Sequence, residues 1–216
     1  AGEAVAVDLA PYESRVIVFT SRDLPPSDAR ALAGAQPLDV STGWTVKFDQ
    51  PATTGEAGAN TSEQMNKLAS WTDNDKTKFY SGVATYDKTI DVPANLANGP
   101  VMLSFGKGTP ATAGYRANGY RTELDAPVRE AAVVTINGKR AGSVWCAPYT
   151  LDVTGLLKPG QNTVSIAVGN LAVNEIAGTG KFPNYDYAGV TKKYGNRFQP
   201  QNVDELMKPV TAGLLG

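Results

Sequence analysis

The sequence predicts an all-β fold, an antiparallel β-sandwich, on the strength of three observations between residues 131 and 168. Residues 131–136 and 163–168 each alternate between two faces, one of them apolar, which is the period of a strand with one buried side. Asn137-Gly138 follows the first run, and this dipeptide between apolar runs is the strongest short-range signal for a tight hairpin. Pro159-Gly160 precedes the second run as a turn, because proline presets φ and glycine accepts positive φ.

The amino-terminal region predicts two short strands, at residues 4–9 and 15–20, followed by a linker at 21–37 that Pro25-Pro26 stiffens. Two strands alone are marginal in water. They therefore either join the main sandwich or end an upstream domain. We expect the sandwich domain itself to span residues 38–216.

Within the sandwich domain, alternating residues predict strands at 44–48, 79–92 and 101–105. A short helix is predicted at 62–69, because Thr61 or Ser62 can cap it and Met65 and Leu68 share a face. Residues 106–125 form a long connection, of the kind that often carries function on a rigid scaffold. From residue 177 the pattern fades, which predicts an irregular tail of extended chain over the sandwich.

Composition excludes several classes of function. A net charge of −1 offers no basic surface for nucleic acid or anionic lipid, and no apolar run approaches the roughly 20 residues of a transmembrane helix. The chain has no histidine, which excludes Ser-His-Asp and Cys-His catalysis and His-ligated zinc. Its one cysteine, Cys146, forms no internal disulfide and has no basic neighbour in sequence to activate it. The chain begins at Ala1 without a signal peptide, so we expect a processed product or an excised piece.

Three segments resemble the carboxy-terminal part of bacterial glycoside hydrolases of the α-L-rhamnosidase type, family 106. They are APVREAAVVTING at 126–138, GSVWCAPYTLDVTGLLKPGQN at 142–162 and GLLG at 213–216. A looser version of the same pattern is similar to the sugar-binding-like sandwich of family 2 glycosidases. Ala147 departs from the pattern, where a second proline is expected before Pro148-Tyr149.

The resemblance implies a jelly-roll-like, galactose-binding-domain-like sandwich in a multidomain bacterial enzyme that is periplasmic or secreted. It also implies that the catalytic barrel lies upstream of Ala1, and that residues 1–20, with PYESRVIVF, end the small β-domain after that barrel. The catalytic carboxylates would then lie outside this chain.

Two pairs of acidic residues are candidates for catalysis or for metal binding. Glycoside hydrolysis needs two carboxyl groups across a cleft. Glu123 and Asp125 are two residues apart, but solvated residues entering a strand are the better interpretation, so no catalytic residue is predicted. Asp73 and Asp75 are the candidate metal ligands, as an oxygen-rich cluster for a structural calcium. They lack the regular spacing of an EF-hand loop, so a solvated turn is the better interpretation. No cofactor is required by the predicted function.

Carbohydrate contact is predicted for one loop. Sandwiches bind sugars through exposed aromatic rings flanked by planar polar groups, and the loop supplies this chemistry, with Trp71 nearby, through Tyr115, Arg116, Asn118, Tyr120 and Arg121. The alternative is that the tyrosines pack beneath the loop and the arginines are solvated or paired. Trp145 and Tyr149 are predicted to pack in the core or hairpin.

The sequence therefore predicts an accessory, non-catalytic sandwich of a glycoside hydrolase, which supports the barrel and contacts a rhamnose-containing glycan. Two alternatives stay open: a free-standing carbohydrate-binding module, and a cell-surface domain that binds protein. A large exposed apolar face on residues 1–20 would argue against the free-standing module.

Overall fold

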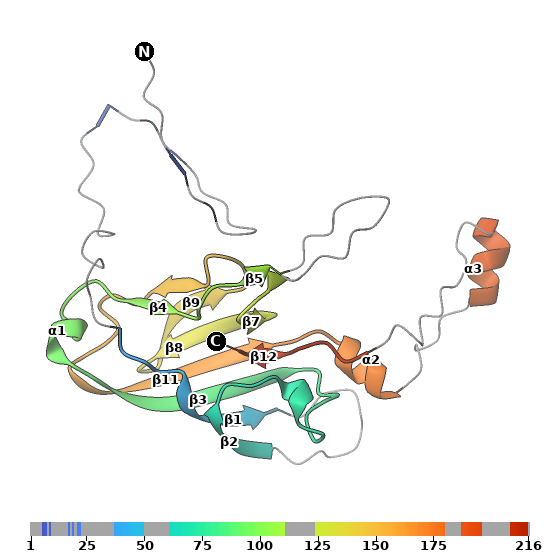
Figure 1. Cartoon of the computed structure of the whole chain (residues 1–216), viewed down its shortest axis with the longest axis horizontal. Coiled ribbons are helices and arrows are strands. Elements are labelled where there is room, and N and C mark those ends of the chain that lie inside the picture. Colours follow the sequence, from blue (N-terminus) through green and yellow to red (C-terminus); the bar gives the residue numbers. More distant parts are fainter. Residues whose placement is uncertain are drawn as a thin grey trace.

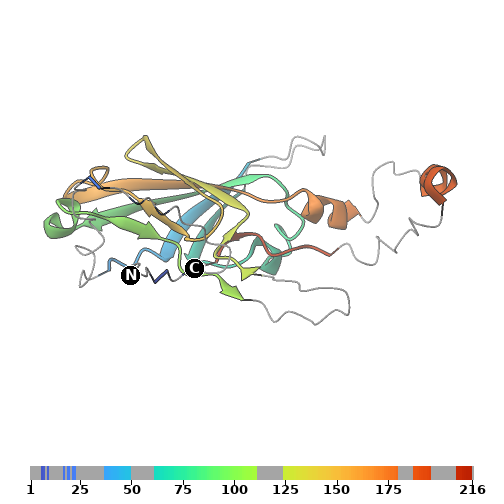
Figure 2. The same ribbon diagram turned by 90° about the horizontal axis from the view of Figure 1, so that it is seen from above.

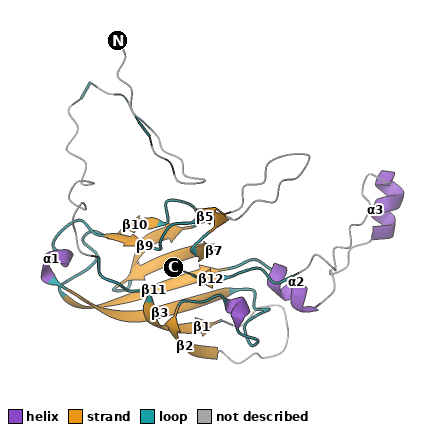
Figure 3. Cartoon of the chain, in the orientation of Figure 1, coloured by secondary structure: helices purple, strands orange, loops and turns teal. Residues whose placement is uncertain are grey.

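A computed structural model of the chain describes residues 6–7, 9, 17, 19, 21–22, 37–49, 61–110, 124–179, 187–195 and 208–215. Strands dominate these residues, as Figure 3 shows. Six of them form one antiparallel sheet, in the order β2 (Thr61–Lys67), β1 (Thr42–Phe48), β3 (Val83–Val92), β11 (Gly160–Gly169), β8 (Ala131–Ile136) and β9 (Lys139–Val144).

Three two-stranded sheets make up the thinner second layer. They pair β10 (Thr150–Asp152) with β4 (Met102–Ser104), β12 (Gly213–Leu214) with β7 (Val128–Arg129), and β5 (Thr109–Pro110) with β6 (Leu124–Asp125). A short helix, α1 (Ala94–Ala97), lies at the opposite end of the sandwich from α2 (Val173–Thr179) in both views (Figures 1 and 2). Among the described residues no helix is long and apolar enough to cross a membrane.

The core lies between the two layers. Alternate residues of the large sheet point inward, so that Val46, Val134 and Ile166 are buried and meet Val153 and Leu214 of the second layer. The period of two that the sequence shows at 131–136 and 163–168 is therefore the inward and outward alternation of β8 and β11. The predicted antiparallel all-β fold is confirmed.

The turn chemistry is also as predicted. Asn137 and Gly138 both have positive φ, 50° and 77°, which a tight two-residue hairpin between β8 and β9 requires. Asn162 fixes this turn to the next one. Its side-chain oxygen accepts from the Asn137 amide (2.8 Å) and the Lys158 backbone N–H (2.9 Å), while its amide donates to the carbonyls of Lys158 and Gly160. Asn162 is buried with all of these bonds made, which explains its place in the Pro-Gly-Gln-Asn motif.

Two predicted elements are wrong. Residues 61–67 form the edge strand β2 rather than a helix, because pairing with β1 along the strand outweighs the weak preference of so short a helix. The tail from residue 177 is not simply extended chain, since it contains the end of α2, α3 (Tyr187–Tyr194) and β12. Asn174 of α2 holds the end of the tail, because its buried side chain donates to the Val210 carbonyl and accepts from the Val210 N–H.

The predicted strands at 4–9 and 15–20 and the linker at 21–37 lie almost wholly outside the described residues. Four large apolar residues there are described, and all are exposed: Val7, Leu9, Ile17 and Phe19. The division of the chain at residues 20 and 37 stays a prediction.

Candidate functional site

Trp71 lies in the core and not at a surface, so its predicted place beside a carbohydrate is wrong in this structure. The residue is 1% exposed and begins a single 3-10 turn, η2 (Trp71–Asp73). Its indole N–H donates to the hydroxyl of Tyr86 (2.6 Å), which also accepts from the backbone N–H of Leu214 (3.2 Å). Edge-on contacts with Phe48 and Tyr80 surround the ring. Trp71 therefore anchors the carboxy-terminal strand to the large sheet.

The rest of the predicted carbohydrate site lies outside the described residues. This applies to the five loop residues Tyr115, Arg116, Asn118, Tyr120 and Arg121, whose role stays a prediction. The two ends of the loop are described, because β5 and β6 pair Thr109 with Asp125 and Pro110 with Leu124. The loop of residues 111–123 thus leaves and re-enters the sandwich at one place.

An ion pair joins that place to the neighbouring strand. The guanidinium of Arg129 in β7 donates to the Asp125 carboxylate at 2.7 Å and also to the carbonyl of Ala126. The Asp125 side chain is largely exposed and is neutralised by this arginine, which fits the interpretation of a solvated residue at a strand end. Glu123 lies outside the described residues.

Trp145 is an exposed aromatic residue whose exposure sequence reasoning missed. It was predicted to pack, but 71% of it is exposed. It follows directly after Val144, whose partner across the sheet is Ala132, and so it lies beyond the last paired residue of the edge strand β9. The signal in the sequence was its position after the final alternating residue and before Cys146-Ala147-Pro148.

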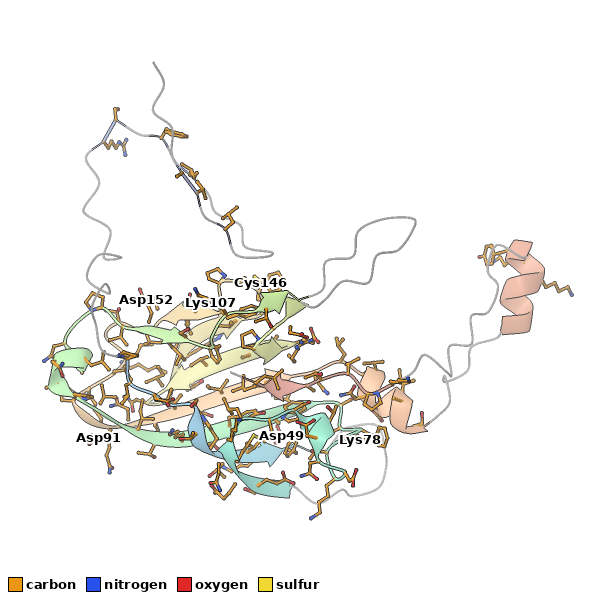
Figure 4. All side chains as sticks on the ribbon, in the orientation of Figure 1. Asp49, Lys78, Asp91, Lys107, Cys146 and Asp152 are labelled. Atoms are coloured by element: carbon orange, nitrogen blue, oxygen red, sulfur yellow. The ribbon has the colours of Figure 1, made fainter. Side chains whose placement is uncertain are left out.

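Tyr149, by contrast, packs as predicted and is buried. Burial raises the pKa of the Tyr149 hydroxyl, the nearby Cys146 and Glu130 raise that pKa further, and the charge of Arg129 opposes them. Trp145, Tyr149 and the Asp125–Arg129 pair thus belong to one end of the molecule. Figure 4 shows Cys146, the neighbour of Trp145, on the side of the sandwich where β5 and β9 lie.

The candidate metal ligands Asp73 and Asp75 lie in and just after η2. Asn74 between them donates to the Glu63 carboxylate. Within the described ranges no group of three or more acidic, cysteine or histidine side chains is placed to hold a metal ion. A calcium at Asp73 and Asp75 would need backbone and water oxygens to complete its shell of six to eight ligands, and it stays a prediction.

An apolar cavity of about 420 Å³ lies between the two layers. It is lined on one side by the large sheet and on the other by β4, β12 and the chain at 37–41, including Trp44, Ile90, Ile166, Leu103, Phe105 and Leu214. Asp39 is the one carboxyl group among its lining residues, so this cavity does not offer the pair of carboxyl groups that glycoside hydrolysis requires.

The fold is similar to one region of a solved glycoside hydrolase. The rhamnosidase from Novosphingobium sp. PP1Y has the same fold over 82% of this chain, with a TM-score of 0.54 and 24% identity, and the match covers 14% of that enzyme. A family 2 β-galacturonidase from Eisenbergiella tayi matches 61% of the chain with a TM-score of 0.41 and 21% identity, over 18% of that enzyme.

In sequence, the chain is 30% identical over 150 residues to a protein of Formosa agariphila named "Putative beta-glucuronidase". The match covers 68% of this chain and 11% of that protein. No family model matches the chain. The resemblance to glycoside hydrolases that the sequence motifs indicate is confirmed, and the chain corresponds to a small part of such enzymes.

Proposed function

We propose that the chain is an accessory, non-catalytic sandwich of a glycoside hydrolase, which supports the catalytic domain of its parent protein and contacts carbohydrate. The observation that carries the proposal is the size of the match: about one ninth of the Formosa agariphila protein and 14% of the rhamnosidase. Most of such an enzyme therefore lies outside the part that this chain resembles.

The chemistry of the described residues supports a non-catalytic role. Two carboxyl groups facing each other across a cleft are the minimum for acid–base glycoside hydrolysis. Asp125 is paired with Arg129, Asp87 is paired with Lys47 at 2.9 Å, and the interlayer cavity is apolar. These carboxylates are held in ion pairs and are not aimed into a shared cleft.

Carbohydrate contact is proposed at the end of the sandwich that carries Trp145. An aromatic ring that is largely exposed can stack on the apolar face of a sugar, and water exclusion makes the contact favourable. The loop of residues 111–123 starts and ends at β5 and β6, and the Asp125–Arg129 pair ties β6 to the strand that leads into β8. The loop's Tyr115, Tyr120 and flanking polar residues are the proposed partners of Trp145, with a rhamnose-containing glycan as the ligand.

Two assays of the purified chain test the proposal. We expect no hydrolysis of aryl rhamnosides or aryl glucuronides, and we expect calorimetric titration with rhamnose-containing oligosaccharides to show weak binding. Tyr120→Ala and Trp145→Ala should each abolish the binding heat, whereas Thr163→Ala, on the outer face of β11, should leave it unchanged. Hydrolysis that is lost on replacing Glu123 or Asp125 would overturn the non-catalytic role.

A further inference from the structure

The interlayer cavity is open at a rim where apolar side chains face solvent. Leu38 and Met102 line it and are each 39% exposed, while the residues deeper in the cavity, such as Trp44 and Ile166, are buried. Water in such a space finds few polar partners, so an apolar cavity of this size favours an apolar occupant.

Strand β4 of the second layer lines this cavity. Strand β4 is paired with β10 on one side, and in the described part of the chain no strand is paired with its other edge. An unpaired edge presents backbone N–H and C=O groups to an incoming extended segment. The site thus combines an open strand edge with an apolar space beneath it, which is the arrangement that an added β-strand completes.

The amino-terminal region offers a segment with the matching pattern. In Arg15–Thr20 (RVIVFT) a strand period of two predicts Ile17 and Phe19 on one face, with Arg15 at the end of that face where it can reach solvent. Val16, Val18 and Thr20 share the other face. The structure describes Ile17 and Phe19, and both are exposed, Phe19 to 82%. Leaving two such side chains in water forgoes the free energy of their burial.

The chain that connects residues 15–20 to the cavity is also long enough. The chain returns to the described sandwich at Pro37, and residues 37–41 themselves line the cavity. The 17 residues from 20 to 36 can span up to about 55 Å when extended, so the segment can reach the edge of β4 from Pro37.

From these observations we infer that Arg15–Thr20 of this same chain adds as a strand to the open edge of β4, with Ile17 and Phe19 filling the interlayer cavity. The sequence left two partners open for residues 1–20, the main sandwich and an upstream domain, and this inference selects the main sandwich. The inference is independent of the proposed carbohydrate contact, which lies at the end carrying Trp145.

The first test uses the dye 1-anilinonaphthalene-8-sulfonate, which fluoresces on entering apolar cavities. We expect the unmodified chain to bind little dye, and the double variant I17S/F19S to raise its fluorescence several-fold and to lower the Tm by about 4 °C or more. The matched control V16S/V18S, on the other face of the same stretch, should change neither as much. Strong one-site dye binding by the unmodified chain, or equal effects of the two double variants, would overturn the inference.

A cysteine pair gives a second test that does not depend on stability. In a C146S background, Phe19→Cys with Leu103→Cys should form an intramolecular disulfide under mild oxidation, as seen by mass spectrometry, whereas Val7→Cys with Leu103→Cys should not. A cross-link that forms only between two molecules would show that the occupant comes from a second copy. Absence of any cross-link in a folded F19C/L103C protein would likewise contradict the inference.

Discussion

Replacing Tyr86 by phenylalanine removes one oxygen atom from the centre of the sandwich. Tyr86 is fully buried, and its hydroxyl accepts from the indole N–H of Trp71 and from the backbone N–H of Leu214. The ring itself is retained in Y86F, so the cavity changes little. The two donors, however, lose their acceptor in a place that water reaches poorly.

The expected cost follows from these two donors. A buried polar group left without a partner costs about 1–3 kcal/mol, so two of them predict a loss of about 2 kcal/mol or more in the free energy of unfolding. For a chain of this size that lowers the Tm by about 4 °C or more. The carboxy-terminal strand β12 should also exchange its amide hydrogens faster, because the Leu214 N–H loses its bond.

Urea unfolding followed by circular dichroism measures the loss, and Tyr80→Phe is the matched control. The Tyr80 hydroxyl donates to the carbonyls of Asp49 and Val83 near the surface, where water can replace it. We therefore expect Y80F to cost about 1 kcal/mol or less. If Y86F were no more destabilising than Y80F, the hydroxyl of Tyr86 would not anchor β12, and the reasoning would be refuted.

Three further predictions concern the same framework. Gly213→Ala should lower the free energy of unfolding more than Gly106→Ala. Both glycines have positive φ (104° and 91°), but only at Gly213 would an added Cβ meet the Trp71 indole nitrogen, at 2.6 Å. Urea unfolding should show an excess loss of about 1–3 kcal/mol for Gly213→Ala, and equal losses would contradict the prediction. Asn162→Leu should cost about 2 kcal/mol or more by the same measurement, since it unpairs the two turns that its amide joins, and a neutral result would show that the turns hold without it. Burial, with the nearby carboxylate of Asp49, raises the pKa of the Tyr80 hydroxyl to about 12. The free energy of unfolding should therefore be constant below pH 10 and fall as the pH rises from 10 towards 12. This alkaline loss should be smaller in Y80F.

The sequence predicted those parts of the fold that are determined by neighbouring residues. The alternation in β8 and β11 and the Asn137-Gly138 turn are local, and each appears in the structure as predicted. Strand β2 was predicted as a helix because its partners in β1 lie 13 to 25 positions away in the sequence, and such pairing does not appear in a local pattern. The conformation of residues 61–67 was determined by their pairing with β1 and not by local preference.

The candidate site was less predictable for a related reason. In the sequence, Trp71 and Trp145 both look like aromatic residues beside a turn, but their exposures are opposite. Trp71 is hydrogen-bonded to Tyr86 and to Ala212 at the carboxy-terminal strand, whereas Trp145 follows the end of an edge strand. Exposure depends on which segment covers a residue, and that is a property of the tertiary structure. The framework role of Tyr149 was predicted correctly, since it belongs to the motif that builds the sandwich.

Acrylamide quenching of tryptophan fluorescence would show whether the proposed site contacts carbohydrate. The chain has three tryptophans; Trp44 and Trp71 are 3% and 1% exposed, so quenching reports almost entirely on Trp145. We expect a rhamnose-containing oligosaccharide to lower the quenching constant of the unmodified chain, and to have no effect on the weak quenching that remains in W145F. A quenching constant that stays unchanged at saccharide concentrations up to the millimolar range would contradict carbohydrate contact at Trp145.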